Sequence, residues 1–125
     1  MDSAVVPRDH LRASLLLVLG EGPAHGYDLP ALLAPLGLGA TDRAFVYRTL
    51  RAMEAEGLVR SAWDASPAGP ARRTYTVTPE GDDWAAGAGA TLRETDRLMA
   101  TWLARYRRLV RAGGPTAVPT VSAAS

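Results

Sequence analysis

The stretch from Thr41 to Val59, TDRAFVYRTLRAMEAEGLV, constrains the fold of this chain more than any other. Val46, Leu50 and Met53 recur at intervals of four and three residues, which places them on one face of an α-helix. Gly57 follows them and can adopt the left-handed conformation that ends a helix. The stretch therefore predicts one amphipathic helix with a buried face, followed directly by a strand.

The opposite face of this predicted helix is polar and carries arginine. Arg48 and Arg51 lie on that face, and Arg43 lies in the first turn. Two alternating stretches follow, Leu58–Asp64 and Arg72–Thr78, and the Pro- and Gly-rich turn between them predicts a β-hairpin. An arginine-bearing helix followed by a hairpin is typical of a winged helix-turn-helix, in which the helix enters a groove of DNA.

Two shorter helices are predicted before the central one. The first, Asp9–Gly20, has a broad apolar face of leucine and valine and is too short to cross a bilayer. The second, Gly26–Leu36, has Pro30 near its first turn and Pro35 near its end, where proline is tolerated or ends a helix. The order of elements is therefore helix, helix, helix, strand, strand.

A long helix is predicted from Pro79 to about Arg111. Its apolar stripe repeats at alternating spacings of four and three and consists of Ala88, Leu92, Thr95, Met99, Trp102, Tyr106 and Leu109. A period of 3.5 residues is typical of a coiled-coil seam, which needs a partner helix. We therefore expect a homodimer whose interface contains Leu92, Thr95, Met99, Trp102, Tyr106 and Leu109.

Short polar residues precede three of the predicted helices and can cap them through side-chain oxygens. They are Asp9, Thr41 or Asp42, and Thr78. The predicted fold class is mainly α with a small antiparallel β-hairpin, a winged helix-turn-helix followed by a long C-terminal dimerisation helix. Its expected parts are a flexible arm (1–7), a DNA-binding domain (8–80), the dimerisation helix (81–111) and a disordered tail (112–125).

Composition limits the possible functions. The chain has no cysteine, so disulfides and thiolate chemistry are absent, and His10 and His25 have no carboxylate cluster at metal-ligand spacing. We expect no catalytic residues, no metal and no cofactor. Residues 1–7 do not resemble a secretory signal, so a cytoplasmic location without membrane contact is expected. The net charge is only +1, so any attraction to nucleic acid must be local.

Several motifs together resemble the PadR-like winged-helix transcriptional regulators. They are GYDL at 26–29, VYRTLRAMEAEGLV at 46–59, Trp63, and GPARRTYTVTPEG at 69–81. The chain departs from the family at Ala44, where many relatives have Gly, and at Arg48, where Pro is common. The resemblance implies a dimeric repressor whose third helix and wing bind operator DNA and whose C-terminal helix dimerises.

The expected contacts to double-stranded operator DNA lie in the third helix, the turn before it and the hairpin. They are Thr41, Asp42, Arg43, Phe45, Tyr47, Arg48, Thr49, Arg51, Arg72 and Arg73. Two of these have alternatives. Tyr47 resembles the family's helix-three tyrosine, which approaches the DNA backbone. Its ring can also pack under the wing, and both can hold because a tyrosine can bury its ring and expose its hydroxyl. Arg51 can instead pair along the helix with Glu54.

Two alternatives to a simple operator-binding repressor stay open. Trp84 and Trp102 are expected core or interface residues, but some family members bind flat apolar compounds between tryptophans at the dimer centre. A small aromatic effector at Leu98, Met99 and Trp102 would make the protein a ligand-responsive, multidrug-type sensor. The other alternative is a winged-helix module that binds protein, which would lack a steep salt dependence of nucleic-acid binding.

Overall fold

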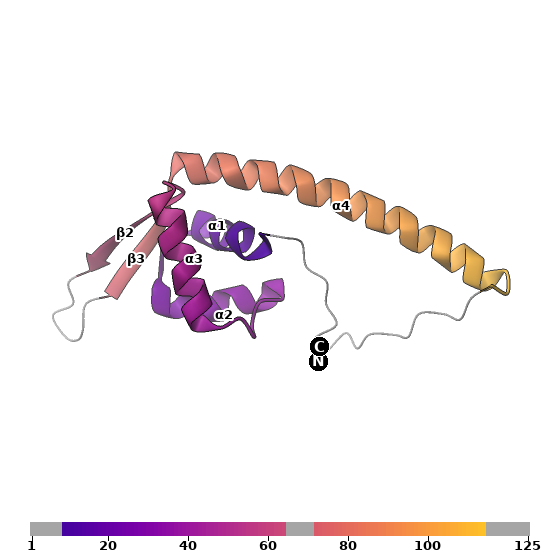
Figure 1. The fold of residues 1–125 in the computed structure, drawn as a ribbon, viewed down its shortest axis with the longest axis horizontal. Helices are drawn as coiled ribbons and strands as arrows, with labels where there is room; N and C mark the ends of the chain where they lie inside the picture. The colour runs from indigo at the N-terminus through magenta and orange to yellow at the C-terminus, as the bar shows by residue number, and fades with distance from the viewer. Residues whose placement is uncertain (1–8, 65–71, 115–125) are drawn as a thin grey trace. The chain divides into compact units, whose positions relative to one another are not determined.

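The computed structural model describes residues 9–64 and 72–114 (Figure 1). The described residues form two compact units, one ending at Gly89 and one beginning at Ala90. The predicted N-terminal arm, the tip of the hairpin and residues 115–125 of the predicted tail lie outside the described residues.

Helices make up most of the first unit. They are α1 (His10–Glu21), the 3-10 turn η1 (Gly26–Asp28), α2 (Leu29–Leu33), the 3-10 turn η2 (Ala34–Leu36) and α3 (Arg43–Ala55). The second predicted helix is therefore a short α-helix between two 3-10 turns. Pro35 lies in the second of these turns, and it cannot donate the backbone hydrogen bond that a longer α-helix would need.

A three-stranded antiparallel sheet completes the winged-helix fold. Its strands are β1 (Ala24–His25), β2 (Val59–Asp64) and β3 (Arg72–Val77), in the order β1-β3-β2. The hairpin of β2 and β3 confirms the prediction, but β1 was not predicted. Two residues are too short to show the alternation that reveals a strand, and β1 exists because its backbone pairs with β3.

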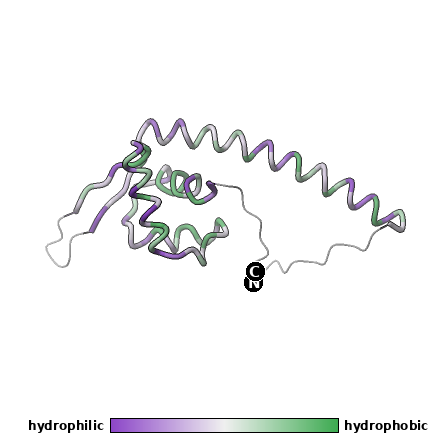
Figure 2. Tube along the Cα trace, viewed as in Figure 1, coloured by the Kyte–Doolittle hydropathy of each residue, from purple (hydrophilic) through white to green (hydrophobic). Residues whose placement is uncertain are grey.

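The core of the first unit lies between α1, α2, α3 and the sheet. Figure 2 shows hydrophobic segments gathered along these helices. The predicted stripe of α3 is buried, since Val46, Leu50 and Met53 are at most 1% exposed. The other fully buried large side chains are Leu15, Leu16, Leu29, Leu33 and Val59. Trp84 and Ala85 at the start of α4 pack against the same core, as the core interpretation of Trp84 predicts.

Two of the predicted helix caps are wrong. Asp9 precedes α1 in a left-handed conformation, with φ of 66°, and Asp42 precedes α3 in an extended one, and neither side chain makes a capping hydrogen bond. Thr41 donates its backbone N–H to the carbonyl of Leu38 in the preceding turn. The cap at Thr78 is confirmed, because its Oγ1 accepts the N–H of Gly81 at 3.0 Å.

The long helix α4 (Pro79–Arg111) has the predicted extent. Its end is closed by Gly113, which has φ of 85°, and by Gly114, whose N–H donates to the carbonyl of Leu109 at 3.0 Å. This is the usual glycine-dependent end of a helix. Residues 112–114, predicted as the start of a disordered tail, therefore form the turn that ends α4. No helix among the described residues is long and apolar enough to span a membrane.

Gly81 lets the start of α4 approach the sheet closely. A Cβ atom at Gly81 would lie 2.1 Å from the carbonyl oxygen of Leu58 and 2.7 Å from Cγ2 of Val77. These distances are far shorter than any tolerated contact, so either the backbone or the helix would have to move. Gly87 lies in the same helix with open space around it.

We expect Gly81→Ala to lower the free energy of unfolding by about 1–3 kcal/mol, the usual cost of overpacking. Gly87→Ala is the matched control and should raise it by up to about 1 kcal/mol, because alanine favours a helix where nothing obstructs its side chain. Urea unfolding at equal protein concentration measures both. Equal effects of the two substitutions would contradict the close packing at Gly81.

Candidate nucleic-acid interface

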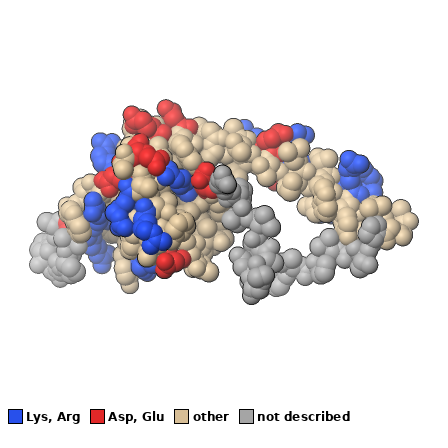
Figure 3. Space-filling view, in the orientation of Figure 1, with Lys and Arg blue, Asp and Glu red and all other residues tan. Residues whose placement is uncertain are grey.

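Burial of the apolar stripe turns the other face of α3 outward. Arg43, Phe45, Arg48 and Arg51 are exposed on it. In Figure 3, arginine atoms gather over α3 and the two long strands. This local concentration of positive charge is what a chain with a net charge of +1 needs to attract a polyanion.

Contacts at the start of α3 join it to the η1 turn. The guanidinium of Arg43 lies 5.1 Å from the ring centre of Tyr27, and its Nη1 is 3.4 Å from both the Tyr27 carbonyl oxygen and the Tyr47 hydroxyl. Tyr47 packs partly buried against the core, and a Cβ at Gly26 would lie 3.1 Å from its Cε1. The ring of Tyr47 therefore packs against the core while its hydroxyl accepts a hydrogen bond from Arg43, and its approach to DNA stays a prediction.

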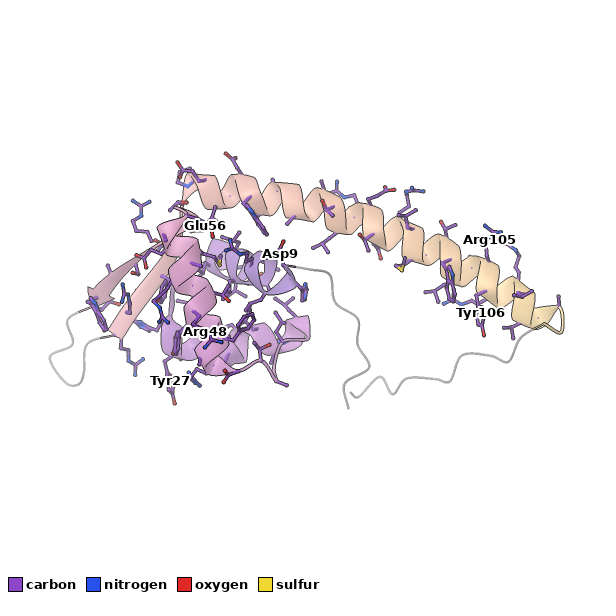
Figure 4. All side chains as sticks on the ribbon, in the orientation of Figure 1. Asp9, Tyr27, Arg48, Glu56, Arg105 and Tyr106 are labelled. Carbon is purple, nitrogen blue, oxygen red and sulfur yellow. The ribbon has the colours of Figure 1, made fainter. Side chains whose placement is uncertain are left out.

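The middle of α3 presents Phe45, Arg48 and Thr49 together. The guanidinium of Arg48 lies 5.8 Å from the ring centre of Phe45. The Thr49 hydroxyl donates to the carbonyl of Phe45 at 2.9 Å, so its oxygen can still accept a hydrogen bond from outside. Figure 4 shows Tyr27 and Arg48 toward the N-terminal end of α3 and Glu56 at its other end.

A polar cluster ties the hairpin to α3. Glu54 accepts the backbone N–H of Ser61 at 3.2 Å and its hydroxyl at 2.8 Å. Arg73 donates Nε to Ser61 Oγ at 2.9 Å, and its Nη2 lies 3.8 Å from Glu54. The suggested pairing of Glu54 with Arg51 is wrong, because the hairpin provides closer partners for that carboxylate. Arg51 is exposed instead.

The outer part of the hairpin carries the remaining predicted arginine. Arg72 is exposed and pairs in register with Asp64 of β2. Asp64 accepts a hydrogen bond from Thr74, and its carboxylate lies 3.8 Å from Nδ1 of His25. A cavity of about 310 Å³ lies between the hairpin and η1. Its lining consists of Arg72, Arg73, Trp63, Tyr27, Tyr47, Tyr75, His25 and Gly26. Burial raises the pKa of Tyr75, which keeps its hydroxyl neutral.

A second ion pair fixes the other end of α3. Arg12 of α1 donates two hydrogen bonds, of 2.8 and 2.7 Å, to the carboxylate of Glu56. These bonds hold the pKa of Glu56 below its ordinary value. Because the pKa of Glu56 is lower in the folded than in the unfolded state, its ionisation stabilises the fold at pH values above the unfolded-state pKa. This stabilisation is lost as the pH falls through the folded-state pKa.

The two glutamates at this end of α3 provide a matched test. Glu54→Ala should lower the free energy of unfolding by about 1–3 kcal/mol, because it leaves the half-buried N–H of Ser61 without its acceptor. Glu56→Ala removes an exposed pair and should cost less, since water replaces the lost partner. Thermal unfolding at pH 7 compares them. A larger loss for Glu56→Ala would contradict the role of the Glu54 cluster.

The second unit presents apolar side chains on α4. Leu98, Met99, Trp102, Leu103 and Leu109 are exposed there. The rings of Trp102 and Tyr106 stack with centres 5.1 Å apart and planes within 7° (Figure 4 labels Tyr106). A groove of about 580 Å³ runs beside them, lined by Leu98, Thr101, Trp102, Arg105, Tyr106 and Leu109. Aromatic and aliphatic surface of this kind is typical of a helix that packs against a partner.

The first unit has the fold of a winged helix-turn-helix protein, with α2 and α3 as the helical pair and β2–β3 as the wing. The model of the transcriptional regulator PadR-like family matches residues 15–86, more than half of the chain. The protein therefore belongs to this family of transcriptional regulators. The long helix α4 continues beyond the matched segment.

Solved structures share the fold. A PadR family transcription regulator from Clostridium difficile is 21% identical, with a TM-score of 0.66 over 75% of this chain and 98% of that one. A PadR family regulator from Eggerthella lenta is 29% identical, with a TM-score of 0.60 over 74% and 84%. Bacillus subtilis PadR, solved in complex with operator DNA, is 22% identical, with a TM-score of 0.56 over 62% and 46%. No curated protein matched the chain in a sequence comparison.

Tyr27, Ser61 and Glu54 take part in this surface although none was a predicted site residue. Tyr27 belongs to the GYDL motif, and Glu54 was considered only as a partner of Arg51. Their contacts join residues 7 to 19 positions apart in sequence, such as Glu54 with Arg73. Periodicity reveals which face of a helix is buried, but it gives no signal for contacts between elements.

Proposed function

We propose that the protein is a cytoplasmic homodimeric repressor that binds a pseudo-palindromic DNA operator through α3 and the wing. The observation that carries this proposal is the exposed arginine surface of α3 and β3, with Arg43, Arg48, Arg51, Arg72 and Arg73. Membership of a transcriptional regulator family supports it, and so does the operator complex formed by the related Bacillus subtilis protein. No cofactor or catalytic group is needed for this function.

In this proposal α3 and the wing do different work. Arg48 and Thr49 lie on the exposed middle of α3, where side chains of a recognition helix reach base edges in the major groove. The start of α3 carries Thr41, Asp42 and Arg43. In the proposed complex these residues contact the sugar-phosphate backbone of the DNA and so position the helix in its groove. Arg72 and Arg73 of the wing would neutralise phosphates, which adds affinity without sequence choice.

The double substitution Arg72→Ala with Arg73→Ala should weaken binding to every duplex. The slope of log K against log salt should flatten by about one to two units per protomer, because one counterion is released for each phosphate neutralised. Arg93→Ala with Arg97→Ala removes the same charge from α4 and is the matched control. Fluorescence anisotropy at several salt concentrations measures the DNA affinity of both variants. An unchanged slope for the wing variant would show that the wing does not contact DNA phosphates.

The proposed dimer interface is the apolar stripe of α4. Leu92, Thr95, Met99, Trp102, Tyr106 and Leu109 recur at coiled-coil spacing, and three of them are exposed in the single chain although they are large and apolar. A second copy of the same helix would cover this surface. The dimer would also hold two DNA-binding domains together, so that each half-site adds to the affinity for an operator with two-fold symmetry.

Met99→Glu should therefore make the protein monomeric at micromolar concentration, because it places a charge in the centre of the stripe. Ala104→Glu adds the same charge to another face of α4 and should leave the dimer intact. Sedimentation equilibrium distinguishes monomer from dimer. A dimeric Met99→Glu variant, or a monomeric wild type, would place no interface on this stripe.

A second candidate function is sensing of planar aromatic compounds. It is favoured by the groove beside the stacked Trp102 and Tyr106 rings, where a flat molecule could stack and Met99 and Leu98 provide adaptable apolar surface nearby. Ligand binding would regulate the operator only through different affinities for the DNA-bound and free states.

A panel of planar dyes should quench the tryptophan fluorescence of the wild type if this groove binds ligand. Trp102→Ala should abolish the effect, whereas Trp63→Phe, which removes an exposed indole from the first unit, should retain it. Bound dye should also change the affinity for duplex DNA. Sensing through this groove fails if quenching survives Trp102→Ala or if DNA affinity is the same with and without dye.

A further inference from the structure

Three arginines of the candidate nucleic-acid interface each lie over an aromatic ring. The guanidinium carbon is 5.1–5.8 Å from the ring centre in every case. The pairs are Arg43 with Tyr27, Arg48 with Phe45, and Arg73 with Trp63. The three rings lie on three different parts of the first unit, namely the η1 turn, α3 and the hairpin.

The rings of these pairs are exposed although they are large and apolar. Tyr27 is 70%, Phe45 is 47% and Trp63 is 65% exposed to solvent. The core is filled by other residues, so these rings are not needed there. Large aromatic side chains left at a surface are enriched where that surface binds a partner.

A ring beneath an arginine limits the freedom of the arginine. An unconstrained arginine has large rotamer entropy, part of which is lost when its guanidinium is fixed on a phosphate or a base. Contact with a ring face attracts the cation and reduces the number of rotamers before DNA arrives. Arg48 shows this most simply, because among the described residues its guanidinium has the Phe45 ring as a partner and no hydrogen bond or ion pair.

We propose that Tyr27, Phe45 and Trp63 are positioning residues for DNA binding, each holding its arginine in the orientation that meets the duplex. This inference rests on the proposed function and adds Tyr27 and Trp63 to the interface. Tyr27 also fixes Arg43 through its carbonyl oxygen, at 3.4 Å. Arg73 is held both by the Trp63 ring and by Ser61, at 2.9 Å. The wing and the start of α3 thereby present arginines that are already ordered.

Double-mutant cycles on DNA affinity test the pairing. For each pair, the ring is replaced by leucine, the arginine by alanine, and then both. Each ring substitution should weaken binding by about two- to five-fold, the equivalent of an exposed cation–π contact. The same ring substitution should have almost no further effect once its arginine is absent. A crossed cycle, Tyr27→Leu with Arg73→Ala, joins residues of different pairs and should be additive.

Two further measurements separate positioning from a merely structural role. Tyr27→Phe keeps the ring and should bind duplex as the wild type does, whereas Tyr27→Leu should not. The slope of log K against log salt should be unchanged in the ring variants, which retain every charge. It should flatten by about one unit for each Arg43 or Arg73 removed per DNA site, because these two are the proposed phosphate contacts among the three arginines. Urea unfolding of each variant confirms that the fold is intact.

The outcomes distinguish this inference from the proposed function. A wild type that shows no salt-dependent duplex binding would overturn the proposed function itself. Normal duplex binding with additive losses within all three pairs would overturn the positioning role alone. If Tyr27→Phe and Tyr27→Leu weaken DNA binding equally, Tyr27 has no positioning role.

Discussion

Burial of Val46, Leu50 and Met53 is the interaction on which the rest of the first unit depends. These side chains fill the space beside the buried leucines of α1 and α2, and this packing fixes the rotation of α3 about its axis. Because the helix has 3.6 residues per turn, the same packing turns Arg43, Arg48 and Arg51 toward solvent. The hydrophobic core and the candidate DNA surface are therefore two consequences of one sequence pattern.

The hairpin is held to this helix by polar contacts. Glu54 accepts two hydrogen bonds from Ser61, and Arg73 approaches both residues. A half-buried carboxylate satisfied by a backbone N–H and a hydroxyl fixes the wing more firmly than an exposed ion pair would. The arginines of the wing and those of α3 consequently belong to one ordered surface. This surface is the basis of our proposal that both elements bind the same duplex.

The sequence predicts elements whose signal lies within a few turns of the chain. Periodicity gave α3 and its buried stripe, and Thr78 followed by Pro79 gave the start of α4. The caps at Asp9 and Asp42 were wrong because capping depends on side-chain orientation as well as residue type. Strand β1 and the contact of Tyr27 with Arg43 depend on partners distant in sequence. The DNA contacts and the dimer stripe stay predictions.

Selection of bound fragments from random duplex DNA tests the central claim most directly. The account predicts that the wild type enriches a pseudo-palindromic motif whose half-sites lie about one helical turn apart. Arg48→Ala should enrich an altered motif, because loss of a base contact costs about 1–3 kcal/mol of discrimination at one position. No enrichment by the wild type would contradict sequence-specific binding, and an unchanged motif would show that Arg48 reads no base.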